Sequence, residues 1–123
     1  MNIKEFSNVT GLSVYTIRYY EKIGLFLHIQ RNSSGHRTFT KDDIKWAQFI
    51  KRLKDTGMPL SKIREYTELR EEGEHTAKHR MKLLQEHSII LKEKIDLELE
   101  HLDNLKKKIN YYSELISGTN SLT

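Results

Sequence analysis

The chain has 123 residues, 37% of them hydrophobic, which suffices for one small domain with an extension but buries little surface without a partner. Lysine and arginine number 21 against 17 acidic residues, and the basic excess lies in residues 1–60, which carry 10 basic and 5 acidic side chains. The lack of cysteine excludes disulfides and thiol-based sensing, and without a secretory-signal pattern or a long apolar run we expect a cytoplasmic protein.

Residues 3–10 predict a short helix, because apolar side chains recur there at three-residue steps before Gly11. Ser13 is the expected N-cap of a second helix, which Gly24 ends. Two short helices joined by a tight turn form a helix-turn-helix. Its core is expected to contain Phe6, Val9, Leu12, Ile17 and Ile23.

The second helix has a polar face rich in hydroxyl, aromatic and cationic groups, which is suited to a DNA major groove. We assign Tyr20 mainly to the core and expect the opposite side to face outward. The outward residues are Tyr15, Thr16, Arg18, Tyr19 and Lys22.

Residues 25–39 predict a β-hairpin wing, since polar turn residues at 32–35 separate two β-branched or apolar ends. Thr40 is the expected cap of a helix over residues 41–56, and Gly57 and Pro59 then precede a further short helix that closes near Gly73. We place a domain boundary at residue 73. The expected core side of the 41–56 helix is Ile44, Ala47, Trp46 or Phe49, Ile50 and Leu53.

Residues 74–116 predict a long helix, because apolar residues alternate at steps of four and three from residue 77 to 116. Such a helix would measure about 60 Å and cannot bury its own seam, so a second copy is expected to cover it. An offset stripe predicts that part of the helix also packs against its own head domain or that of a neighbour, and it consists of Leu83, Ile90, Leu97 and Tyr111. Residues 117–123 are expected to form a flexible tail. The predicted dimer-interface residues are Met81, Leu84, Leu91, Ile95, Leu102, Leu105, Ile109 and Tyr112.

Three motifs in this order resemble the MerR family of bacterial transcription regulators over essentially the whole chain. Thr16-Ile-Arg-Tyr-Tyr-Glu21 with Gly24-Leu25 resembles the recognition-helix signature of the family. Ser34-Gly35-His36-Arg37 with Phe39 resembles its wing, and Asp43-Ile44 through Gly57-Met58-Pro59-Leu60 resembles its helix pair.

The resemblance implies a mainly α fold, in which a winged helix-turn-helix head is followed by a long C-terminal helix that forms an antiparallel dimeric coiled coil. It also implies a homodimer that binds an inverted-repeat promoter site, distorts the DNA and works beside RNA polymerase. The DNA-binding residues expected on this basis are Ser13, Tyr15, Thr16, Arg18, Tyr19, Lys22, His36, Arg37 and Thr38. From the residues themselves we expect no enzyme activity and no cofactor, because the sequence offers no nucleophile with a base, no glycine-rich phosphate loop and no paired carboxylates.

Other interpretations of these residues remain open. Arg18 could instead form an ion pair with Glu21 or Glu5. His75 and His79 are four residues apart, a spacing at which two imidazoles can share a metal ion, but two ligands do not complete a site. The chain as a whole could also be a coiled-coil adaptor, or a metal or small-molecule sensor that uses the junction near residue 73, and the identity of an effector is not encoded in any motif.

Overall fold

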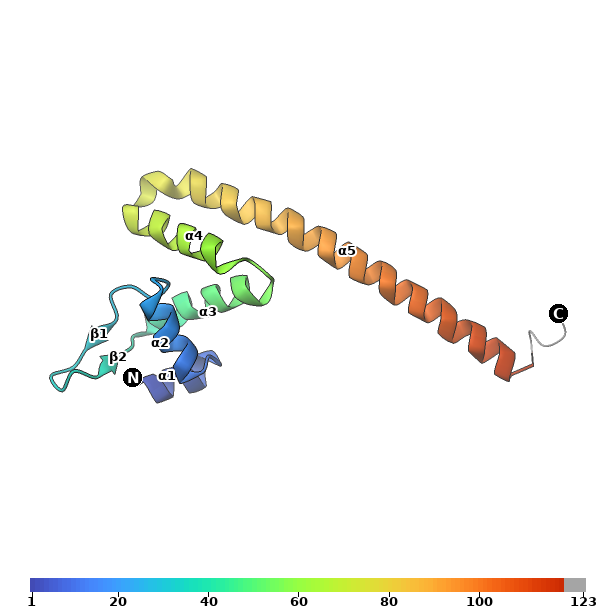
Figure 1. Ribbon diagram of the computed structural model, residues 1–123, viewed down its shortest axis with the longest axis horizontal. Coiled ribbons are helices and arrows are strands. Elements are labelled where there is room, and N and C mark those ends of the chain that lie inside the picture. Colours follow the sequence, from blue (N-terminus) through green and yellow to red (C-terminus); the bar gives the residue numbers. More distant parts are fainter. Residues whose placement is uncertain (119–123) are drawn as a thin grey trace. The chain divides into compact units, whose positions relative to one another are not determined.

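The computed structural model describes residues 1–118 and confirms the predicted mainly α fold (Figure 1). A helix-turn-helix, a small antiparallel hairpin, a helix pair and a long C-terminal helix follow one another as expected. The elements are α1 (Ile3–Thr10), α2 (Val14–Lys22), β1 (Gln30–Arg31), β2 (Arg37–Thr38), α3 (Lys41–Asp55), α4 (Leu60–Glu72), a 3-10 turn (Glu74–Thr76) and α5 (Ala77–Ile116).

Two compact units divide the chain between Gln85 and Glu86, within α5. The first unit, which we call the head, contains every element up to the beginning of α5, and the second contains the rest of that helix. The domain boundary proposed at residue 73 stays a prediction. Of the predicted flexible tail, residues 119–123 lie outside the described residues. Among the helices of residues 1–118, none combines the length and the apolar character that spanning a membrane requires.

Both helices of the helix-turn-helix begin at side-chain caps. The Asn2 side chain accepts from the backbone of Glu5, and Glu5 accepts from the backbone of Asn2, which satisfies two N–H groups at the start of α1. Gly11 ends α1 at a φ of +77°, a conformation that glycine adopts without strain. Ser13 then caps α2, as predicted, by accepting from the backbone N–H of Thr16 at 3.0 Å.

The core of the head contains most of the side chains expected there, including Phe6, Leu12 and Ile17. Val9 was also expected in the core, but it is exposed, so this part of the prediction is wrong. Each three-residue step in a helix falls about 60° short of a full turn, so a third apolar residue at that spacing has rotated away from the interior. Thr10 is buried in its place, and its hydroxyl donates to the carbonyl of Phe6 at 2.8 Å.

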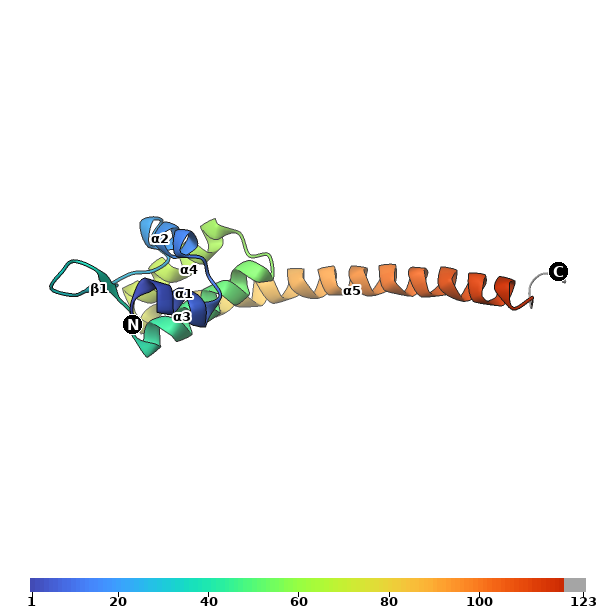
Figure 2. The same ribbon diagram turned by 90° about the horizontal axis from the view of Figure 1, so that it is seen from below.

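The wing is smaller than the 25–39 segment predicted for it. Its strands β1 and β2 have two residues each, with Gln30 opposite Thr38 and Arg31 opposite Arg37. The Asn32 side chain organises the turn by accepting from the backbone N–H groups of Ser34 and His36. Figures 1 and 2 show the hairpin as a projection beside α2.

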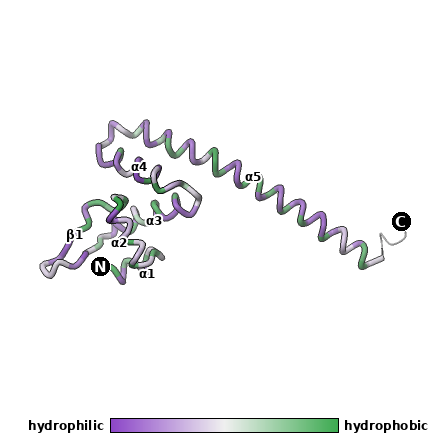
Figure 3. The backbone as a smooth tube through the Cα atoms, in the orientation of Figure 1, coloured by the Kyte–Doolittle hydropathy of each residue, from purple (hydrophilic) through white to green (hydrophobic). Residues whose placement is uncertain are grey.

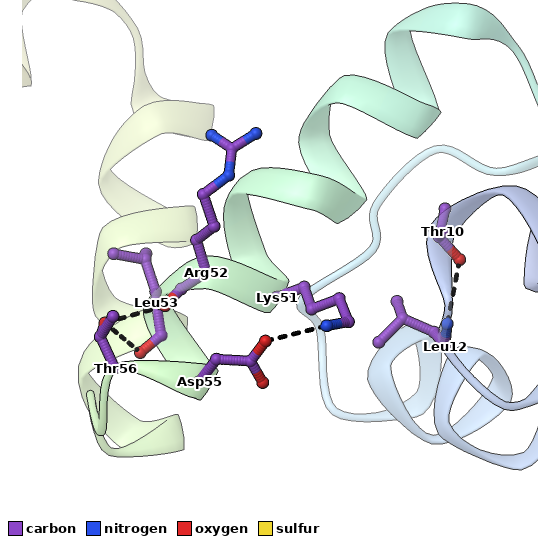
Figure 4. Close-up of polar contacts among 7 residues, drawn as sticks. All are labelled: Thr10, Leu12, Lys51, Arg52, Leu53, Asp55 and Thr56. Atoms are coloured by element: carbon purple, nitrogen blue, oxygen red, sulfur yellow. Dashed lines mark hydrogen bonds and ion pairs between the residues drawn. The ribbon is translucent and has the colours of Figure 1, made fainter.

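Helix α3 begins at a capping box formed by Thr40 and Asp43, which confirms Thr40 as the predicted cap. At its other end, the Thr56 hydroxyl donates to main-chain carbonyls of the last turn, and Lys51 pairs with Asp55 at 2.9 Å (Figure 4). Helix α3 packs against both α1 and α4. It therefore joins the helix-turn-helix to the helix pair.

Helix α5 differs between its two ends. Within the head, Leu83 of the offset stripe is buried and Leu84 packs against the head core, whereas the other members of that stripe are exposed: Ile90, Leu97 and Tyr111. Beyond residue 85 most apolar side chains of the helix are exposed. Figure 3 shows hydrophobic and hydrophilic segments alternating along this part of α5.

Candidate nucleic-acid interface

One side of α2 is fixed in the interior of the head. Ile17 and Tyr20 are buried, and Tyr20 lies edge-on to the ring of Phe26. Burial raises the pKa of the Tyr20 hydroxyl, with smaller contributions from Asp55 and Tyr19. Tyr20 is therefore a core residue, as the sequence indicated, and the opposite side of α2 faces outward.

The outward side of α2 carries two tyrosines and two cations around a shallow hollow of about 270 Å³, lined by Tyr15, Arg18, Tyr19 and Lys22. Tyr15 is 79% exposed and Tyr19 is 41% exposed. Their rings lie nearly parallel, with centroids 6.4 Å apart. Phenolic hydroxyl groups and cations on an exposed helix face are groups that contact phosphates and base edges.

Neither cation of this hollow forms an ion pair within residues 1–118. The acidic partners considered for Arg18 are engaged elsewhere, because Glu5 belongs to the α1 cap and Glu21 faces the wing. Arg18 and Lys22 are exposed and project positive charge outward. An anionic surface is the complementary partner for this charge.

The other DNA-contact candidates occupy two places. The Ser13 hydroxyl serves the α2 cap and also donates to the Thr16 hydroxyl at 2.8 Å. On the wing, His36 is exposed beside the turn, whereas Thr38 is half-buried on β2. Their roles in DNA binding stay predictions.

Arg37 lies on β2 beside the wing tip, and its Nε donates to Glu21 Oε1 at 2.7 Å. Glu21 also lies 3.8 Å from a terminal nitrogen of Arg31. Local sequence reasoning missed this arrangement because these residues are 10 to 16 positions apart, so no helix or strand period relates them. The only usable signal was the register of the hairpin, which sets Arg31 opposite Arg37.

The tryptophan that the sequence analysis offered for the core side of α3 has a structural role. Trp46 donates from its ring nitrogen to the carbonyl of Leu25 at 2.8 Å and packs beside Phe49 and Tyr66, while the Arg70 guanidinium lies 4.3 Å from its ring centre. These contacts identify Trp46 as a packing residue of the head.

The histidine pair at the beginning of α5 does not gather a set of metal ligands. His79 lies 3.6 Å from a carboxylate oxygen of Glu65, and the ring of His75 lies beside Gly73. Across residues 1–118 there is no group of three or more potential protein ligands placed to hold a metal ion.

The predicted dimer-interface residues divide into two groups. Leu84 contacts the head core, and Leu91 is half-buried. The others are exposed along α5 and share one seam by their spacing: Met81, Ile95, Leu102, Leu105, Ile109 and Tyr112. Tyr111 and Tyr112 are exposed as well, and Lys108 Nζ lies 5.2 and 5.6 Å from their ring centres.

Comparison with known proteins gives a consistent result. The family model described as "MerR HTH family regulatory protein" matches residues 1–69, and that described as "MerR, DNA binding" matches residues 44–109. The HTH-type transcriptional regulator AdhR of Bacillus subtilis is 39% identical over 84 residues, which are 68% of this chain and 60% of AdhR. This chain thus matches less than two thirds of that relative's length.

Two solved structures share the fold over nearly the entire chain. A protein described as a MerR family transcriptional regulator from Listeria monocytogenes has a TM-score of 0.91 and 43% identity, covering 99% of this chain and 93% of its own. HiNmlR, described as a MerR family regulator lacking the sensor domain and bound to promoter DNA, has a TM-score of 0.84 and 29% identity, covering 99% of this chain and 98% of its own.

Proposed function

Because the chain belongs to the MerR family of helix-turn-helix regulatory proteins, we propose that it binds an inverted-repeat promoter site as a homodimer and regulates transcription by distorting that DNA. Its relatives are DNA-binding transcriptional regulators, and the chain is accordingly a regulator with a DNA-binding head, not an enzyme. We place it in the cytoplasm, at the promoter beside RNA polymerase.

The proposal depends on one observation, the exposed charged and aromatic groups on the outward face of α2. Arg18 and Lys22 are exposed cations without an acidic partner in the described chain, and they flank the parallel rings of Tyr15 and Tyr19. Phosphate contacts by such cations supply most of the affinity for a duplex, and base-edge contacts supply the choice of sequence. An adaptor function would leave this charged aromatic surface without a purpose.

The exposed seam of α5 supports the homodimer. Its apolar residues repeat at the spacing of a coiled coil and find no cover in their own compact unit. A second copy offers the same seam, and a two-fold axis places two identical heads on two half-sites of opposite orientation. The family resemblance favours the antiparallel arrangement and the DNA distortion, which reads the deformability of the site between the half-sites.

The test is duplex binding measured by fluorescence anisotropy, with fragments selected from the host genome by the wild-type protein. Arg18→Ala should weaken binding on the order of 10-fold at physiological salt and lower the salt dependence by about one counterion. Lys45→Ala, which removes an exposed positive charge from α3, is the matched control and should change affinity much less. Unchanged affinity of a folded, dimeric Arg18→Ala protein would refute the assigned role of α2.

A further inference from the structure

Glu21 connects the recognition helix to both strands of the wing. Its Oε1 accepts from Arg37 Nε at 2.7 Å and lies 3.8 Å from Nη2 of Arg31. The side chains of Glu21 and Arg37 are 24% and 22% exposed, so their pair is largely shielded from solvent. A single carboxylate thus joins α2 to β1 and β2.

The register of the hairpin explains why a carboxylate is needed at this place. Arg31 and Arg37 are direct partners across the two-residue ladder, and like charges in that position repel each other. The negative charge of Glu21 between them offsets this repulsion. The guanidinium of Arg31 has a second contact, because its Nη1 donates to the carbonyl of Gly35 in the turn at 3.0 Å.

The pair with Glu21 occupies only part of the Arg37 guanidinium. Arginine has five N–H donors, and the contact with Glu21 uses the one on Nε. No hydrogen bond within residues 1–118 uses the four donors on the two terminal nitrogens of Arg37. Glu21 therefore orients the group and leaves its phosphate-binding end available.

We propose that Glu21 is a positioning residue for specific DNA recognition: its carboxylate holds Arg31 and Arg37 against α2 and so fixes the distance between the wing and the recognition helix. This inference rests on the proposed DNA-binding function. A fixed distance favours a duplex whose grooves match both surfaces. Without Glu21, the two arginines become mobile cations that attract any phosphate backbone.

The experiment compares Glu21→Gln and Glu21→Ala with the wild type. Glutamine keeps the shape and removes the charge, whereas alanine removes the acceptor. Affinities for the selected site and for an unrelated duplex of equal length are measured at several salt concentrations. For both variants we expect about 3-fold tighter binding to unrelated DNA, a salt dependence steeper by about one to two counterions, and a ratio of specific to non-specific affinity lowered at least 10-fold.

Glu72→Gln is the matched control, because it removes one negative charge from an exposed position at the end of α4 and Glu72 forms no ion pair with Arg31 or Arg37. An equal change in the control, or an unchanged affinity ratio in the Glu21 variants, would overturn the proposal. Parallel weakening of both affinities without a steeper salt dependence would also overturn it, since it would reveal a merely structural role.

A second measurement keeps this inference separate from the proposed function. In the DNA-free protein, the Nε–H of Arg37 should exchange slowly with solvent and give a distinct NMR signal that Glu21→Ala abolishes. A rapidly exchanging Nε–H in the wild type would contradict the positioning role. If the wild type bound no duplex, the proposed function would fail, while this signal would still decide whether Glu21 fixes the wing.

Discussion

Two isoleucines show how differently the two units of this chain complete their folding. Ile63 of α4 is 0% exposed and lies in the core of the head, whereas Ile109 of α5 is 66% exposed. The head covers its apolar side chains with its own helices. Within the residues that the structure describes, the second unit is a single helix that leaves most of its apolar side chains exposed, and an isolated helix gains little stability unless its apolar face is packed.

The largest effect that would sharpen this comparison is expected in the core of the head. Ile63→Ala should lower the free energy of unfolding by about 2–5 kcal/mol, because it removes buried methyl groups and leaves a cavity. Urea denaturation followed at two protein concentrations measures it, and the loss should not vary between them. Val9→Ala, at an exposed position of α1, is the control and should cost less than about 1 kcal/mol. Similar losses for both variants would contradict the core assignment.

A charge introduced into the seam of α5 should affect the second unit and not the head. Ile109→Asp is expected to raise the dimer dissociation constant on the order of 100-fold, since an unpaired carboxylate would be buried between two helices. Sedimentation equilibrium measures this constant. Asn110→Asp places the same charge on the neighbouring face of α5 and should leave the dimer intact. If Ile109→Asp dimerised as strongly as the wild type, the seam would not be the interface.

The smallest of the three effects is expected at the cap of α3. Thr40→Ala removes the acceptor for the Asp43 N–H and should lower the stability of the head by about 1 kcal/mol. Thr40→Ser retains a capping hydroxyl and should restore most of the loss in thermal unfolding. A dependence of this loss on protein concentration would show that the head is not independent of the dimer.

Local rules were sufficient to predict the order of the elements and several of their ends. Ser13 and Thr40 cap their helices as expected, because a hydroxyl before an apolar pattern satisfies orphan N–H groups wherever it occurs. The assignment of Val9 to the core was wrong, because a strict three-residue spacing departs from the period of a helix. The predicted roles of the α2 residues in DNA binding remain predictions, although the structure exposes Tyr15, Arg18 and Tyr19 as those roles require.

The contacts of Glu21 could not be predicted in the same way. Its partners on the wing are distant in sequence, and each of the two arginines alone is an ordinary surface cation. Only the register of the hairpin places both beside one carboxylate. The exposed seam of α5 was predictable because heptad spacing is a property of one helix, and in the described residues most of that seam is uncovered.

The position of Trp46 gives the protein a built-in optical reporter. It is the sole tryptophan of the chain, it lies in α3, and its ring is held between the Leu25 carbonyl and the Arg70 guanidinium. Indole emission therefore follows the unfolding of the head alone. Far-ultraviolet circular dichroism instead measures the helical content of all helices together, including the 40 residues of α5. On dilution, a fall in ellipticity at constant emission would mark the loosening of the long helix while the head stays intact.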